Sequence, residues 1–307
     1  MIYTCTMNPA IDLFIATKEM LPFTVNRTIE DEAQPNGKGV NISFILKMLN
    51  LDNTATGFTG GFTGDFIKEE LEKQQILTDF VDIDGMTRIN VFTNVEKEEV
   101  EFKLVNRGPE ISNQEQKVLL EKINKLGTDD VLFVSGSNPR GVNDEILVEI
   151  AKLSSQNKFQ LILDSSSKVV LECLNYRPYL VKPNDEELAS WFRRNTIEAS
   201  ERIKYGKKLI ELGAQNVLLS LGSEGSLFID QDKLLQVNAP KGKVMNTACS
   251  GDTLLGTFVG LLKKGWKIEE ALKKASAAAS STAFKSGLTD FSDVDELMKD
   301  LTVIQIN

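Results

Sequence analysis

The sequence predicts an α/β fold in which helices cover both faces of a central, mostly parallel β-sheet and a small second sheet forms a lid over a cleft. Segments that are apolar throughout, such as VLFVSGS at 131–137, alternate with longer segments of helical periodicity. Strands that are buried on both faces and joined by helical crossovers have this pattern. The segments 13–35 and 88–106 alternate apolar and polar residues instead, as expected of a sheet with one covered face.

The first hundred residues combine both kinds of strand with two helices. Apolar residues between 38 and 49 recur at spacings that give a helix a wide buried face. The polar turn EKEE separates two short strands and indicates a hairpin. The expected elements are strands at 2–5, 13–15 and 27–30, a helix at 38–49, a strand at 54–58 entering the Gly-rich turn TGGFTGDF, a helix at 65–74, and strands at 90–95 and 99–105.

From residue 112 onward, helices and apolar strands alternate regularly, which indicates a parallel sheet. The last helix is unusually rich in Ala and Ser. The expected elements are helices at 112–126, 143–154, 168–174, 185–194 and 199–212, strands at 131–137, 159–167, 179–184 and 216–225, a hairpin at 226–230 and 234–237, and helices at about 251–264 and 268–285.

Composition excludes several classes of function. The 307 residues carry 35 Lys and Arg against 44 Asp and Glu, and a formal charge of −9 argues against binding to nucleic acid or to anionic membranes. Because histidine is absent, His-dependent hydrolases and His-ligated metal sites are excluded, and acid–base chemistry falls to Asp, Glu, Lys, Tyr or Cys. The three cysteines are widely spaced, and we find neither a signal peptide nor a membrane helix. We therefore expect a cytoplasmic protein built as a single domain over 1–307, with the lid at about 12–36 and 88–106.

The segment NTACSGDT at 246–253 carries the strongest chemical signal. Small residues at a helix start expose the amides of Cys249, Ser250 and Gly251, where the helix dipole favours an anion. The same dipole would favour the ionised form of Asp252, which suits a base that deprotonates an alcohol attacking a phosphoryl group. The alternative is that Asp252 only caps the helix. Cys249 is either a structural thiol or one whose pKa is lowered at the helix start.

Three further segments carry weaker signals. Two glycines around a lysine, in NGKGVN at 36–41, allow a ligand to approach the backbone, and Asn36 could take a left-handed conformation. Asn184 and Glu187 lie one helical turn apart and offer oxygen ligands to Mg²⁺, although acidic residues at a helix start more often only compensate the dipole. Around the lid and the strand ends, the candidates for ligand contact are the basic residues Arg27, Lys38, Arg88 and Lys103, the turn residues Ser220, Gly222 and Gly225, and Asp12, Ser135 and Asp164.

The ordered segments TMNPAID, NGKGVN, TGGFTGDF, TRINV, SGSNP, KPNDEE, SLGSEG and NTACSGDT resemble the PfkB branch of the ribokinase-like sugar kinases, over residues 1 to about 300. The resemblance implies a Rossmann-like three-layer α/β domain with a small β-sheet lid, and a homodimer that forms through the lid. It also implies a phosphotransferase that uses ATP and Mg²⁺ to phosphorylate a phosphosugar. TRINV and GFTGGFTG are similar to segments of the 1-phosphofructokinases and tagatose-6-phosphate kinases, and favour fructose 1-phosphate as acceptor over tagatose 6-phosphate.

The resemblance also implies roles for individual residues. Asp252 matches the catalytic base, and the amides of Cys249, Ser250 and Gly251 match the anion hole. The remaining matches are Asp12, Gly37, Lys38 and Asn41 for the sugar, Arg27, Arg88 and Lys103 for its phosphate, Lys182, Asn184 and Glu187 for the nucleotide and Mg²⁺ (the ion held through water), and Ser220, Gly222 and Gly225 for the turn that borders ATP.

Two positions depart from the family pattern, because Asn36 and Cys249 stand where glycine is usual. A side chain at Cys249 could crowd the γ-phosphate or force a positive φ. A sugar-phosphate sensor with little catalytic activity therefore stays an alternative. A dinucleotide-dependent oxidoreductase is a weaker one, because the sequence contains no GxGxxG after a strand.

Overall fold

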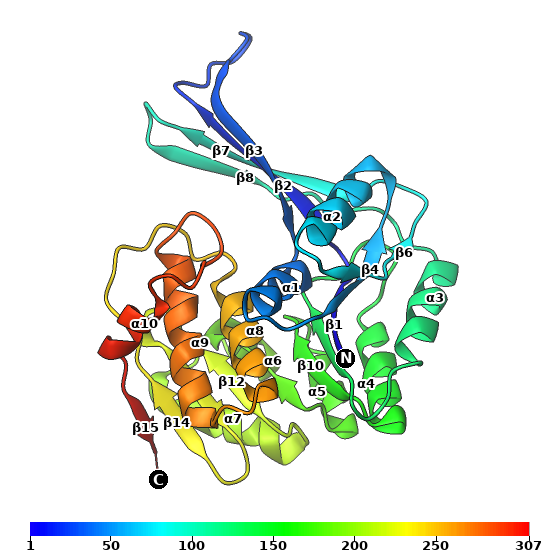
Figure 1. Cartoon of the computed structure of the whole chain (residues 1–307), viewed down its shortest axis with the longest axis vertical. Helices are drawn as coiled ribbons and strands as arrows, with labels where there is room; N and C mark the ends of the chain where they lie inside the picture. The colour runs from blue at the N-terminus through cyan, green and yellow to red at the C-terminus, as the bar shows by residue number, and fades with distance from the viewer. Residues whose placement is uncertain (307) are drawn as a thin grey trace.

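Two β-sheets organise the structure, a large one covered by helices and a four-stranded one that projects from one end of it (Figure 1). The computed structural model describes residues 1–306; Asn307, the last residue of the predicted domain, lies outside the described residues. The mostly parallel central sheet and the small second sheet that the sequence predicts are both present. Among the described residues, no helix is both long enough and apolar enough to cross a bilayer.

Eight strands of the large sheet are parallel, and an antiparallel edge of three strands continues it. Across the sheet, the order is β15-β14-β13-β12-β11-β10-β9-β1-β4-β5, with β6 also paired to β4. The strands are β1 (Ile2–Thr6), β4 (Thr54–Thr59), β5 (Leu77–Thr78), β6 (Val81–Asp82), β9 (Val131–Ser135), β10 (Gln160–Asp164), β11 (Leu180–Val181), β12 (Val217–Ser220), β13 (Ser226–Ile229), β14 (Leu234–Val237) and β15 (Val303–Gln305).

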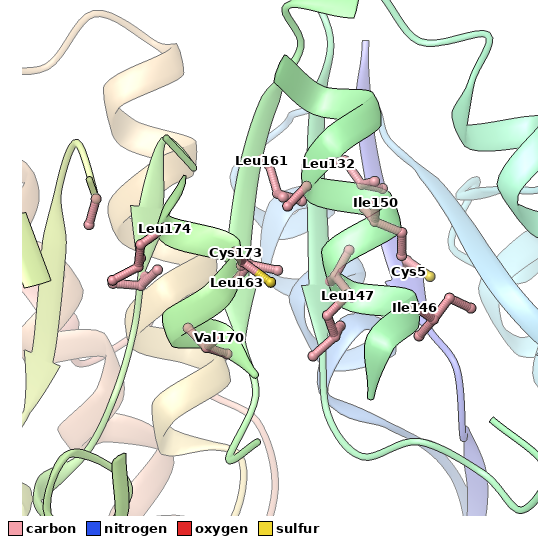
Figure 2. Close-up of a cluster of buried hydrophobic side chains, with 14 of the residues drawn as sticks. Cys5, Leu132, Ile146, Leu147, Ile150, Leu161, Leu163, Val170, Cys173 and Leu174 are labelled. Carbon is pink, nitrogen blue, oxygen red and sulfur yellow. The ribbon is translucent and has the colours of Figure 1, made fainter. Parts of the chain in front are cut away.

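Helices bury both faces of this sheet because successive residues of its strands point to opposite sides. In β9, Leu132 and Val134 join the cluster drawn in Figure 2, whereas Val131 and Phe133 join the cluster on the other face. The first face is covered by α3 (Asn113–Ile123), α4 (Glu145–Asn157), α5 (Val170–Cys173) with the 3₁₀ turn Leu174–Tyr176, α6 (Asp185–Trp191) and α7 (Ala199–Leu212). The second is covered by α1 (Lys38–Met48), α8 (Ser250–Lys263), α9 (Ile268–Ala283) and α10 (Val294–Leu297) with the 3₁₀ turn Met298–Asp300.

Helices α1 and α8 pack closely because α8 presents glycines to α1. A Cβ atom at Gly256 would lie 3.1 Å from Ile45 Cγ2, and one at Gly260 would lie 3.0 Å from Leu49 Cδ1. This close contact brings the N-terminal turns of the two helices together beneath the small sheet (Figure 1).

The small sheet, called the lid sheet below, has the order β3-β2-β7-β8. Strand β2 (Ala10–Thr17) runs antiparallel to β3 (Thr28–Asn36) and parallel to β7 (Arg88–Val95), which forms the predicted hairpin with β8 (Val100–Leu104). On one face Asp12 pairs with Asn90 and Phe14 with Phe92, whose rings stack at a centroid distance of 5.1 Å. Helix α2 (Gly61–Lys73) contacts the base of the lid sheet.

Several element boundaries differ from the prediction. The strand expected at 27–30 runs on to Asn36, because β2 pairs with it along its whole length and so offsets the low strand propensity of EDEAQPN. The helix expected at 65–74 begins at Gly61, where Gly64 packs within reach of Thr59 and only small residues fit. The strand expected at 179–184 is reduced to β11, and the sequence prediction missed β5, β6, α10, β15 and the 3₁₀ turn Gly222–Glu224.

Candidate active site

Asp252 lies in the first turn of α8 and is 5 % exposed. Its Oδ2 accepts a hydrogen bond of 2.9 Å from Asn41 Nδ2, in the first turn of α1. The alternative in which this carboxylate caps the helix is wrong, because Cys249 is the N-cap and no side chain caps the helix. The buried carboxylate is therefore held by an amide donor of another helix and does not cap the start of α8.

The electrostatic surroundings of Asp252 raise its pKa, contrary to the expectation from the helix dipole. Burial raises the pKa most and the charge of Asp164 adds to it, while Lys38, Asn41 and Lys182 lower it. The result is a pKa of about 7. A carboxylate with a pKa near neutrality is suited to accept a proton from a substrate and then release it.

The start of α8 has the open backbone of an anion site. Cys249 is left-handed, with φ 62° and ψ −6°, as the replacement of a glycine had suggested. The first amides of a helix have no acceptor within it, and Ser250 N reaches Thr247 O only at 3.4 Å. Lys182 Nζ lies 3.4 Å from the place where a Cβ of Gly251 would stand. The amides and this ammonium group together favour an anion.

The thiol of Cys249 does not have the lowered pKa of a helix-start nucleophile. Burial raises its pKa, and Asp252 and Asp12 raise it further. The alternative of a lowered pKa is therefore wrong, because burial and the two nearby carboxylates disfavour the thiolate.

Asp164 joins the two lysines of the site. Its Oδ1 lies 3.1 Å from Lys38 Nζ and 3.1 Å from Lys182 Nζ. Burial alone would raise the pKa of Asp164, but the two ammonium groups hold it below its ordinary value. Burial would likewise lower the pKa of Lys38, yet Asp164, Asp252 and Glu187 raise it. The position of Asp164 at the carboxyl end of a strand was the available signal, but it did not reveal this ion-pair network.

Asp12 is the carboxylate at the base of the lid sheet, and two amides hold it. Asn90 Nδ2 donates to its Oδ1 at 2.8 Å, and Asn36 Nδ2 donates to its Oδ2. Asn36 is not left-handed as expected; it ends β3 and is absent from the residues with positive φ within 1–306. The side chains of Asn36 and Asn90 both contribute to the site, and sequence reasoning missed both contributions.

A cavity of about 270 Å³ lies between the lid sheet and the starts of α1 and α8. Asp12, Asn36, Asn41 and Cys249 are among the residues that line it. The other lining residues are Phe14, Gln34, Pro35, Phe44, Glu70, Gln74, Phe92, Glu101, Lys103, Asn246, Ala248, Thr282, Lys285, Ser286, Gly287 and Leu288.

The predicted basic residues are only partly brought together. Lys103 lines the cavity and pairs with Glu101 at 2.9 Å. Arg88 donates to the carbonyls of Asn8 at 2.9 Å and Asn106 at 2.8 Å, and its Nε is buried without a partner in residues 1–306. Arg27 lies beside the first residue of β3, at the end of the strand opposite to Asn36. In a single chain, Arg27 is therefore remote from the other members of this set.

Several buried polar atoms near the carboxyl edge of the large sheet lack partners within the described residues. They are Ser135 Oγ, Thr6 Oγ1, Asp164 Oδ2 and Ser250 Oγ. Gly37, at φ 139°, lies close enough to Thr6 that a Cβ would stand 2.6 Å from its Cγ2. Buried polar atoms without partners are uncommon, and their concentration here indicates a place for a polar ligand or water.

The segment after β11 is ordered by a capping box. Asn184 Oδ1 accepts from Glu187 N at 2.7 Å, and Glu187 Oε2 accepts from Asn184 N at 3.0 Å. This geometry agrees with the structural alternative for these acidic residues, although one oxygen of Glu187 remains free of the box. The neighbouring turn follows Ser220, whose amide donates to Pro183 O at 3.1 Å.

Glycine is required at positions 222 and 225 of that turn for two different reasons. At Gly225, with φ 98°, a Cβ would lie 1.9 Å from Val237 O, so only glycine fits. Gly222, with φ 56°, has open space around its missing Cβ, as is needed where a ligand approaches the backbone. Arg202 fixes the turn by pairing with Glu224 at 2.7 Å and with Asp185 of α6 at 2.7 Å.

Comparison with known proteins identifies relatives across the chain. Residues 5–295 match the pfkB family of carbohydrate kinases. D-tagatose-1-phosphate kinase from Bacillus licheniformis is 50% identical over 307 residues, and 1-phosphofructokinase from Bacillus subtilis is 33% identical over 306 residues; each match covers 100% of both chains. Phosphofructokinase-2 from Escherichia coli has the same fold, with a TM-score of 0.90 at 27% identity over 97% of this chain and 98% of its own. A second structure of that enzyme is of its tetrameric inhibited form.

Proposed function

The chain belongs to the pfkB family of carbohydrate kinases and is a sugar-phosphate kinase, and we propose that its acceptor is a ketohexose 1-phosphate, first of all D-tagatose 1-phosphate. The relative that is 50% identical supports this acceptor. Fructose 1-phosphate, which the sequence motifs favour, is the second candidate and is supported by the 1-phosphofructokinase relative. The two sugars carry the phosphate at the same carbon and differ only in configuration at C4. Tagatose 6-phosphate ranks third, because its C6 oxygen, which is the proposed phosphoryl acceptor, already carries a phosphate.

The observation that carries the proposal is the position of Asp252 beside the first amides of α8. The C6 hydroxyl oxygen attacks the γ-phosphorus of ATP, the bond from that phosphorus to the bridging oxygen of ADP breaks, and the hydroxyl proton passes to Asp252. The pKa of about 7 leaves a substantial fraction of Asp252 ionised at neutral pH. Asn41 holds the carboxylate in place through its hydrogen bond of 2.9 Å.

Charge that spreads over the transferred phosphoryl group would be stabilised by preorganised donors. The amides of Cys249, Ser250 and Gly251 lie at the positive end of the α8 dipole. Lys182 is 4 % exposed and Asp164 orients its ammonium group. We assign the amides to the γ-phosphoryl oxygens and Lys182 to the same phosphate chain, because no other buried ammonium group within 1–306 stands beside Gly251.

Mg²⁺ fits the residues present only as an ion held largely by phosphate and water. No group of three or more Cys, Asp or Glu side chains in the described part of the chain could hold a metal directly. Mg²⁺ commonly takes one or two carboxylates and completes its shell with water and substrate phosphates. We propose that Glu187 holds it through water with the oxygen outside the capping box, while Asn184 keeps the helix start in place. The ion would neutralise phosphate charge.

The remaining predicted contacts fit the same proposal. Asp12, Asn41 and Lys103 line the cavity that would hold the acceptor, and we assign Gly37, Lys38, Ser135 and Arg88 to the same acceptor from the segments that match the family. Ser220, Gly222 and Gly225 form the turn that would border the nucleotide.

We further propose that two copies associate through their lid sheets. Large apolar side chains are exposed on the lid sheet and its connecting loop: Phe23 by 106 %, Val25 by 84 %, Leu104 by 63 % and Phe102 by 50 %. Apolar surface of this kind is unusual on an isolated monomer and is typical of an interface. Within β8, Phe102 and Leu104 alternate with Lys103 and so lie on the face opposite the cavity, where a second copy can bind without blocking the acceptor.

The proposal is tested by measuring ADP release from MgATP with four acceptors: tagatose 1-phosphate, fructose 1-phosphate, tagatose 6-phosphate and fructose 6-phosphate. We expect the highest kcat/KM with tagatose 1-phosphate and the next highest with fructose 1-phosphate. A higher kcat/KM with either 6-phosphate would contradict the acceptor. If the protein binds a sugar phosphate tightly but releases no ADP with any acceptor, the sensor alternative is correct instead.

A further inference from the structure

Almost all donors and acceptors of the Asn36 side chain have hydrogen-bond partners within the protein. Its Oδ1 accepts from Gly37 N at 2.6 Å and from Asn41 Nδ2 at 2.9 Å. Its Nδ2 donates to Asp12 Oδ2. A carboxamide oxygen has two lone pairs and the nitrogen has two hydrogens, so only the second N–H of Asn36 is uncommitted within residues 1–306.

The orientation of this carboxamide is fixed by its neighbours. If the group were turned over, its oxygen would face the Asp12 carboxylate and its nitrogen would face the amide N–H of Gly37 and the Asn41 NH₂ group. Both contacts would be repulsive. Asn36 therefore presents a donor, and no acceptor, to the cavity that it lines.

Asp12 is equally constrained and stands directly beside that donor. Its two oxygens each accept one amide, from Asn36 and from Asn90, so the carboxylate cannot rotate. The remaining lone pairs of Asp12 and the free N–H of Asn36 form an acceptor and a donor side by side in one wall of the cavity. A hydroxyl can satisfy both at once, because it donates through its hydrogen and accepts through its oxygen.

We propose that Asn36 is a specificity-determining residue, whose free N–H and the adjacent Asp12 carboxylate together bind the C4 hydroxyl of the acceptor and select its configuration. The inference rests on the proposed function and names the acceptor hydroxyl whose configuration the cavity distinguishes. Tagatose 1-phosphate and fructose 1-phosphate differ only at C4, and the epimer whose hydroxyl points away leaves a donor and an acceptor unpaired. Sites that must hydrogen-bond a substrate hydroxyl discriminate strongly for this reason.

The same geometry separates this role from catalysis. Asn41 donates to Asp252 directly, at 2.9 Å, and this bond does not pass through Asn36. Loss of the Asn36 side chain should therefore lower kcat/KM for the acceptor that the wild type prefers more than for its C4 epimer. A residue that only positioned the base would instead lower kcat for both acceptors alike.

The test compares kcat and KM for tagatose 1-phosphate and fructose 1-phosphate in the full chain and in Asn36→Gly and Asn36→Ala. Asn50→Gly is the matched control, because Asn50 lies at the other end of α1, is exposed and has a φ of 56° that glycine adopts easily. We expect the wild-type preference for tagatose 1-phosphate in kcat/KM to fall by about tenfold in both Asn36 variants, as when one hydrogen bond to the substrate is lost. The control should keep the wild-type ratio. Thermal unfolding of each variant shows that it is folded.

Each other outcome has a distinct meaning. An unchanged ratio in a folded Asn36 variant overturns this inference and leaves the proposed function standing, as does an equal loss with both acceptors. A wild-type ratio near one also overturns the inference alone. A wild-type protein that phosphorylates neither 1-phosphate overturns the proposed function, and this inference with it.

Discussion

Asn41 donates a hydrogen bond to Asp252 across 2.9 Å and thereby joins the first turn of α1 to the first turn of α8. The two helices can approach this closely because Gly256 and Gly260 of α8 leave room for side chains of α1. Since Asn41 also donates to Asn36, the carboxylate is linked through two amides to the lid sheet. The site is thus held together by side-chain amides from elements that lie far apart in the sequence.

Replacement of Asp252 by asparagine tests the role of the base. Asn has nearly the same shape but cannot accept the hydroxyl proton, so we expect kcat to fall by about 10²–10⁴-fold or more. Nucleotide binding should persist, because the amides of α8 and Lys182 are unaltered. Steady-state ADP release and equilibrium binding of MgATP measure the two effects separately. Near-normal turnover in Asp252→Asn would refute the assignment.

The pH dependence of kcat/KM should report the raised pKa of Asp252. The active base is the ionised form, so activity should rise with pH through about 7 in the wild type. In Asn41→Ala the ionised carboxylate loses a hydrogen bond that lowers its pKa, and the acid limb should therefore move to higher pH. The substrate phosphate titrates alike in both proteins and cancels in the comparison. An acid limb that stays in place, or moves to lower pH, would show that Asn41 does not stabilise the base.

The ion-pair network of Lys38, Asp164 and Lys182 should contribute to folding as well as to binding. Lys182→Met leaves the buried Asp164 paired with Lys38 alone, so the free energy of unfolding should fall by less than about 3–5 kcal/mol, the amount lost when a buried charge has no partner left. The double variant Lys182→Met with Asp164→Asn should recover part of this loss, because it removes the buried charge that Lys182 had helped to compensate. Chemical denaturation of the three proteins gives the comparison.

The sign of the pH effect on this network provides a second check. The folded pKa of Asp164 is lowered, so its ion pairs stabilise the protein above the unfolded carboxyl pKa. That contribution is lost as the pH falls through the still lower folded pKa. The difference in unfolding free energy between wild type and Lys182→Met should therefore shrink in acid. A difference that grows as the pH falls would contradict the assignment.

The alternation of apolar strands and amphipathic helices was sufficient to predict the large sheet and the presence of the lid sheet. Buried strands such as β9 and β10 have a local hydrophobic signal that tertiary contacts reinforce. The second half of β3 has no such signal, because it is polar, contains Pro35 and is at most half-buried; its structure comes from pairing with β2. Short elements such as β5 and β6 are likewise defined by their partner β4 and not by their own sequence.

For the site, motifs identified the residues at helix starts and strand ends but not the contacts between them. Asp252 and Asp12 stand out in the sequence because each lies in a recognisable segment. The network through Asn90, Asn36 and Asn41 depends on the register of β2 with β7 and on the packing of α1 against α8. The direction of the pKa shift at Asp252 also required the structure, because it arises from burial and from the charge of Asp164, which is distant in the sequence.

Position 249, which Cys249 occupies, should accept glycine but not a β-branched residue. Its φ of 62° costs a residue with a side chain about 1–2 kcal/mol, and glycine removes that strain but loses about 0.5–1 kcal/mol through its greater unfolded entropy. Cys249→Gly should therefore keep its kcat and its stability to within about 1 kcal/mol. In Cys249→Val the start of α8 must shift, and kcat should fall. Cys173→Val is the control, because Cys173 is buried in the core away from the site; a Cys249→Val protein as active as this control would contradict the prediction.

Charge on the outer face of β8 should separate two associated copies. Phe102→Lys together with Leu104→Lys places two ammonium groups on the exposed apolar face, where burying them against a second copy would be costly. Light scattering should give twice the 34.1 kDa of one chain for the wild type and a single chain for the variant. Leu77→Lys is the matched control, because Leu77 is 60 % exposed but lies in β5 at the far edge of the large sheet, and its mass should stay that of two chains. A wild type with the mass of one chain, or a lid variant that remains paired, would refute association through the lid sheet.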